Sequence, residues 1–126
     1  MGSYLNPGNA LFKMAVNSQI FVDKSMLIDV TNRYLNTMQR FICVSRPRRF
    51  GKSVAADMLA AYYDRSVDSF ALFEHLEISS QKSYGIHLNQ YDVIKLNMQE
   101  FLSRTKNIYE LLDRMKRLVL RDLKRE

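Results

Sequence analysis

The feature that most constrains this chain is the stretch of residues 41–53, an apolar run followed by a basic turn and a Gly-Lys-Ser sequence. Its first four residues are all apolar, which is typical of a central parallel strand covered on both faces. The pattern G-x-x-x-x-G-K-[ST] between a strand and a helix indicates a phosphate-binding loop. Here Gly51, Lys52 and Ser53 fill the last three positions, and Arg46 stands where the first Gly is usual.

The segments around this stretch predict the context that a phosphate loop needs. Residues 53–64 contain several Ala, Met and Leu and no Gly or Pro, so they favour a helix. Residues 93–98 alternate apolar and polar side chains, which predicts a second parallel strand beside the first. We therefore expect an α/β fold, a partial P-loop NTPase-like three-layer arrangement in which helices flank a short parallel sheet.

The remaining segments complete one expected domain over residues 1–126. Residues 1–19 form an N-terminal extension whose apolar part could be a strand or a helical turn, and residues 20–22 are prone to form a strand. Asp23 is a suitable N-cap for a helix that ends near Asn36. Residues 79–90 are polar and predict a connecting loop. A long, basic, amphipathic helix is expected within 104–126, with Asn107 and Glu110 suited to capping its start.

The chemistry of a phosphate loop explains these residue types. Gly51 lets the backbone approach a phosphate, Lys52 reaches the β and γ phosphates, and the Ser53 hydroxyl ligates Mg²⁺. Arg48 and Arg49 could add bidentate contacts to phosphate or face solvent. A basic turn without any ligand is the alternative. The predicted nucleotide-binding residues are Arg46, Pro47, Arg48, Arg49, Phe50, Gly51, Lys52, Ser53 and Val54, and the predicted metal ligand is Ser53.

The sequence resembles a predicted AAA-ATPase-like family of bacteria and archaea, whose longer members carry a restriction-endonuclease-like nuclease domain. The resemblance covers roughly residues 18–102. It rests on Phe21-Val22-Asp23-Lys24-Ser25, Leu27-Ile28, Arg46-Pro47-Arg48-Arg49-Phe50-Gly51-Lys52-Ser53, Tyr62-Tyr63, Leu72-Phe73 and Tyr91-Asp92-Val93-Ile94-Lys95-Leu96.

That resemblance implies ATP and Mg²⁺ as cofactors, bound at the Gly-Lys-Ser sequence, in the N-terminal part of a longer protein. Asp23 and Lys24 form a second family signature of unclear role, for which a helix cap and a solvated lysine are the simpler interpretation. No apolar strand in this sequence ends in Asp-Glu, the acidic motif that holds magnesium through water. We therefore expect weak hydrolysis of ATP or none, and the sequence leaves open whether the chain is an enzyme.

Composition suggests further partners. A net charge of +6 and a pI near 9.6 suit an anionic partner. The alternative function is a non-enzymatic interaction or inhibitor protein that binds nucleic acid, or a protein that processes it, through Arg40, Arg46, Arg48, Arg49 and the C-terminal helix. A second copy or another protein is expected to cover the exposed edge of the sheet.

The remaining residue types favour an ordinary cytoplasmic domain. Cys43 is the single cysteine, so it forms no intrachain disulfide, and its apolar surroundings predict a buried thiol. No apolar stretch approaches the roughly 18 residues that span a bilayer. His75 and His87 lack the spacing of a zinc site, so we interpret them as packing or surface residues.

Overall fold

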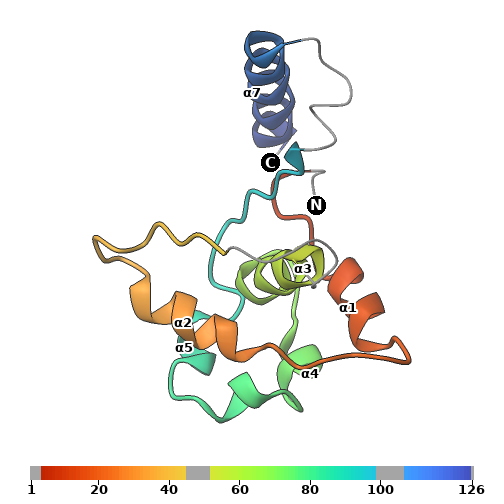
Figure 1. Ribbon diagram of the computed structural model, residues 1–126, viewed down its shortest axis with the longest axis vertical. Coiled ribbons are helices and arrows are strands. Elements are labelled where there is room, and N and C mark those ends of the chain that lie inside the picture. Colours follow the sequence, from red (N-terminus) through yellow and green to blue (C-terminus); the bar gives the residue numbers. More distant parts are fainter. Residues whose placement is uncertain (1–3, 45–51, 99–106, 126) are drawn as a thin grey trace.

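A computed structural model describes residues 4–44, 52–98 and 107–125 (Figure 1). Within these ranges α3 lies in the middle of a helical body, with α1 and α2 on opposite sides of it, whereas α7 stands apart (Figure 1). The helices are α1 (Ala10–Val16), α2 (Met26–Tyr34), α3 (Lys52–Tyr63), α4 (Phe70–Phe73), the 3₁₀ helix η1 (Glu77–Ser80), α5 (Tyr84–His87) and α7 (Ile108–Arg125).

The predicted parallel sheet is wrong, because the described residues form helices and two isolated β-bridges but no strand. Residues 41–44 are irregular and exposed, and Cys43, predicted to be buried, is exposed with them. The segment 20–22 is irregular as well. An α/β three-layer arrangement is therefore not the architecture of the described part of the chain.

Residues 93–95 pair with the N-terminal segment instead of with residues 41–44. The amide of Asn6 donates to the Val93 carbonyl at 2.7 Å, and the amide of Lys95 donates to the Tyr4 carbonyl at 2.9 Å. Leu5 and Ile94 thereby form an isolated antiparallel bridge. The alternating pattern identified a segment that can pair, but a strand forms only where a partner extends the hydrogen-bonded ladder over several residues.

The helical predictions are confirmed with small shifts. The helix predicted over 53–64 is α3, and the predicted C-terminal helix is α7, whose first turn is capped by Asn107 because its side-chain oxygen accepts the Glu110 amide at 2.9 Å. α2 ends before Asn36, whose φ of 61° is left-handed, a conformation that ends helices. The apolar part of the N-terminal extension forms α1. The loop predicted over 79–90 is wrong in part, since it contains α5.

The core lies where α1, α2 and α3 meet the short helices η1, α4 and α5. Phe12 of α1 stacks on Phe73 of α4 with ring centroids 5.0 Å apart, and Tyr62 of α3 meets Phe73 edge to face at 5.6 Å. The buried cluster consists of Phe12, Ile28, Met58, Ala61, Tyr62, Phe73, Ile78 and Tyr84. Burial of these large side chains is the main stabilising term of the body.

α7 is joined to the N-terminal segment through a buried carboxylate. Asp122 is fully buried and accepts hydrogen bonds from the amides of Tyr4 at 2.5 Å and Leu5 at 3.3 Å. Leu111 is the buried apolar residue of the same helix. The N-terminal segment thus contacts both α7 and residues 93–95.

Candidate nucleotide-binding site

The Gly-Lys-Ser sequence leads directly into α3. The helix begins at Lys52, so Lys52 and Ser53 are its first two residues. The first amide groups of a helix have no acceptor within the helix, and together with the helix dipole they attract anions. The first turn of α3 contains no acidic residue. This helix end is therefore electrostatically suited to a phosphate group.

The structure places only part of the predicted site. Arg46, Pro47, Arg48, Arg49, Phe50 and Gly51 lie outside the described residues, and the predictions made for them stay predictions. Ser53 and Val54 are exposed in the first turn of α3. The described part thus contains only the last residues of the motif, among which Ser53 is exposed.

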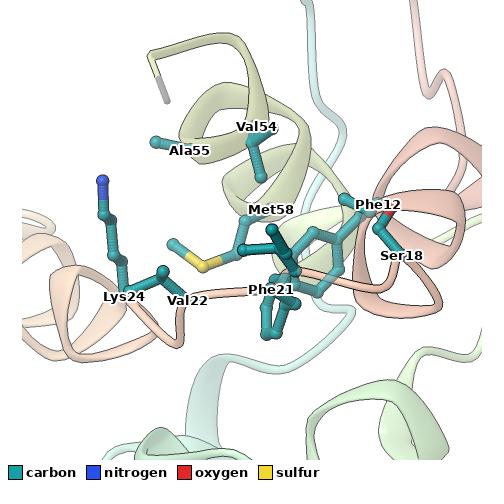
Figure 2. A pocket seen from close by; sticks show the side chains of 10 residues that line it. Phe12, Ser18, Phe21, Val22, Lys24, Val54, Ala55 and Met58 are labelled. Atoms are coloured by element: carbon teal, nitrogen blue, oxygen red, sulfur yellow. The ribbon is translucent and has the colours of Figure 1, made fainter. Parts of the chain in front are cut away.

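A cavity of about 350 Å³ lies beside this helix end, between α1, the segment 18–24 and α3. We call it the α3 pocket. Figure 2 shows Val54, Ala55 and Met58 along the α3 side and Phe12 and Phe21 opposite them. Phe12 and Met58 are buried, so they form its floor. Its volume falls in the lower part of the range of small-molecule sites, about 300 to 1,000 Å³.

Asp23 holds the segment 18–24 in place. Its carboxylate accepts the Ser25 amide at 2.8 Å and the Glu77 amide at 2.9 Å, and the Ser25 hydroxyl accepts the Ile78 amide at 3.1 Å. Burial alone would raise the pKa of Asp23, but the hydrogen bonds from Ser25 and Glu77 outweigh it and lower the pKa below its usual value of 3.8. The predicted helix-cap role of Asp23 is therefore wrong: α2 begins after Ser25, and Asp23 joins its own segment to η1.

The far end of α3 is fixed by two tyrosines. The Tyr62 hydroxyl donates to the Tyr84 carbonyl at 2.6 Å and accepts from Asn32 at 3.2 Å. The Tyr63 hydroxyl donates to the Asn32 side-chain oxygen at 2.6 Å. Burial of both rings raises the pKa of Tyr62 and of Tyr63 to about 12. The two hydroxyls thus stay neutral at ordinary pH and fasten α3 to α2 and α5.

Sequence reasoning missed the α3 pocket. Its residues come from three separate segments, and Phe12, Phe21 and Met58 look like ordinary core residues in the sequence. The available signal was the family signature at residues 21–25, because three of its residues line the pocket. In the structure Ile20 and Val22 are 87% and 65% exposed. Exposure of that kind cannot be read from the residue types.

Other candidate groups lie in local contacts. The His87 ring nitrogen Nδ1 and the Tyr91 hydroxyl are 2.8 Å apart, and His75 lies 3.3 Å from the Glu74 carboxylate. Among the described residues no group of His, Cys, Asp and Glu is arranged to hold a metal ion. In the same part of the chain, no helix has the length and apolar character needed to cross a membrane.

Comparison with known proteins identifies the family. The model of a family described as predicted AAA-ATPases matches residues 10–125, a span that contains the Gly-Lys-Ser sequence, α3 and every helix bordering the α3 pocket. The chain belongs to this AAA-ATPase-like family. Searches of the curated proteins and of the solved structures found no match.

Proposed function

We propose that this chain is a nucleotide-binding module that binds ATP with Mg²⁺ at the start of α3. One observation carries the proposal: α3 begins inside the Gly-Lys-Ser sequence, so the motif ends at a helix N-terminus without acidic residues in its first turn. The backbone amides of the first turn and the Lys52 ammonium group would bind the phosphates, and the Ser53 hydroxyl would ligate the magnesium ion. Family membership supports this assignment.

We expect these 126 residues to hydrolyse ATP slowly or not at all. The one stretch that resembled a second strand, residues 93–98, contains no acidic residue. Asp92 precedes it, and its carboxylate lies 2.7 Å from the Arg65 guanidinium and accepts a hydrogen bond from Asn6. A carboxylate engaged in this way is poorly placed to orient a water molecule that ligates magnesium.

Isothermal titration calorimetry with Mg-ATP tests the binding proposal. Lys52→Ala should weaken binding by at least about tenfold, since a charged contact to phosphate contributes about 1.5 to 3 kcal/mol. Lys82→Ala is the matched control, because Lys82 is an exposed lysine between η1 and α5 and does not line the α3 pocket. Ser53→Ala should reduce the dependence of affinity on magnesium. Equal affinities of the Lys52→Ala variant and the unsubstituted chain, or no heat at millimolar ATP, would refute the proposal.

A second function, binding of nucleic acid, is favoured by the arrangement of charge on α7. Arg117, Arg121 and Lys124 are exposed and recur at helical spacing, so they share one face. If this face binds phosphates, the affinity for a DNA duplex must fall steeply between 50 and about 200 mM salt. Replacing the three residues by Gln should abolish a gel shift at low salt. Salt-insensitive binding, or an unchanged shift with the triple variant, would contradict this function.

A further inference from the structure

The α3 pocket shares its helix with the phosphate motif. Val54 follows Ser53 directly, and Ala55 and Met58 continue along the same helix. A helix rises about 1.5 Å per residue, so Met58 lies about 9 Å along the axis from Lys52. The pocket therefore begins within one helical turn of the residues that we propose to bind the phosphates.

The pocket walls suit a flat apolar group. Phe12 and Met58 are almost fully buried at its floor, at 1% and 2% exposure, whereas Ile20 and Val22 leave apolar side chains open to solvent at its rim. Such an exposed apolar rim above a buried floor gains free energy when a ring covers it. An unbranched phosphate chain alone would leave this apolar surface exposed.

Charge within the pocket lies on one side. Figure 2 shows the Lys24 side chain extending from the segment before α2, with its amino group directed away from Phe12 and Phe21. The pocket thus has an apolar end, formed by the two phenylalanines, and a cationic edge at Lys24. An occupant that is apolar at one end and anionic at the other matches this polarity.

We propose that the α3 pocket holds the nucleobase of the nucleotide whose phosphates bind at Lys52 and Ser53. This inference rests on the proposed function. The base lies between Phe21 and Val54 over the buried floor, and Lys24 borders the side that leads to the phosphates. The segment that Asp23 fastens to η1 is then one wall of the nucleotide site, which gives the signature at residues 21–25 a role in binding.

Titrations with Mg-ATP and with Mg-tripolyphosphate, which lacks base and ribose, separate the two proposals. Tripolyphosphate should bind about five- to 150-fold more weakly than ATP, because one stacked base contributes a factor in that range. Equal affinities for the two ligands would overturn the base site and leave the phosphate site standing. Failure of both ligands to bind would refute the proposed function, and the base site with it.

Two adjacent alanines provide a matched pair of variants. Ala55 lines the pocket, whereas Ala56 is exposed outside it on the same turn. Ala55→Leu should narrow the pocket and move the ATP affinity toward that of tripolyphosphate, without changing tripolyphosphate binding. Ala56→Leu should change neither. A loss of ATP affinity that is the same in both variants would overturn the inference.

The rim offers a second pair in case Ala55→Leu disturbs folding. Val22→Ser changes a side chain that is 65% exposed and should weaken ATP binding severalfold without changing tripolyphosphate binding. Ile86→Ser, at a 67% exposed position outside the pocket, should change the binding of neither ligand.

Light scattering on the same samples tests the competing occupant, a second copy of the chain. A dimer that dissociates on Val22→Ser, together with unchanged ATP affinity, would assign the pocket to that copy and overturn the base site.

Discussion

The Asp23→Asn substitution tests how the wall of the α3 pocket is held. The two carboxylate oxygens of Asp23 each accept one backbone amide, from Ser25 at 2.8 Å and from Glu77 at 2.9 Å. Asparagine keeps one acceptor oxygen and presents an NH₂ group to the other amide. A hydrogen bond to a charged group contributes about 1.5 to 3 kcal/mol. Because the Glu77 contact is exposed, we expect a loss of about 1.5 kcal/mol in the free energy of unfolding.

Urea denaturation followed by circular dichroism measures this loss, and its pH dependence identifies the carboxylate as the cause. The pKa of Asp23 is lower in the folded chain than its usual value of 3.8. The stabilisation is therefore complete above about pH 4 and disappears as the pH falls through the folded-state pKa. The difference between the unsubstituted chain and the variant should be constant from pH 7 to pH 5 and should shrink by pH 3.

The control is Asp113→Asn, which removes an exposed i,i+4 ion pair with Arg117 and should cost less than about 0.5 kcal/mol. If Asp23→Asn is as stable as the unsubstituted chain at pH 7, the hydrogen bonds to Ser25 and Glu77 do not hold the segment. A destabilisation that stays unchanged down to pH 3 would equally refute the role given to the charge.

Two further predictions concern the far end of α3 and the segment 41–44. Tyr62→Phe removes the hydroxyl that donates to the buried Tyr84 carbonyl and should lower the free energy of unfolding in urea by about 1 to 3 kcal/mol. Tyr109→Phe, at an 82% exposed position, should leave it nearly unchanged. Equal effects of the two substitutions would refute the buried network. The exposed Cys43 should react with a thiol reagent in the folded chain almost as fast as in 6 M urea, and a much slower reaction would show that the segment 41–44 is covered.

An element could be predicted from the sequence when the interactions that form it lie within the element itself. α3 and α7 were predictable because their spacing, their freedom from Gly and Pro, and the Asn107 cap act within the helix itself. The strand predictions failed, because an apolar run indicates only that a segment is able to pair with another segment. The amides and carbonyls of residues 93–95 found their partner in residues 4–6, a segment whose sequence carries no strand pattern.

The candidate site divides in the same way. Lys52 and Ser53 belong to a contiguous motif, so the sequence alone was enough to propose them as site residues and to predict that a helix follows them, which α3 confirms. The α3 pocket was not, since it joins three segments that are separated along the chain. Asp23 shows the difference within one residue: its type and position suggested a cap for α2, but its hydrogen bond to Glu77 spans a separation of 54 residues and depends on where η1 packs.

α3 connects these two halves of the site physically. Its first turn carries Lys52 and Ser53, Ala55 and Met58 face the pocket, and Tyr62 and Tyr63 fasten its last turn to α2 and α5. Because these hydrogen bonds hold the last turn of the same helix, the phosphate position and the base position that we propose would be set together. Tyr62 and Tyr63 fix the position of α3, and Asp23 fixes the segment on the other side of the pocket. Together they set the distance between the start of α3 and that pocket wall.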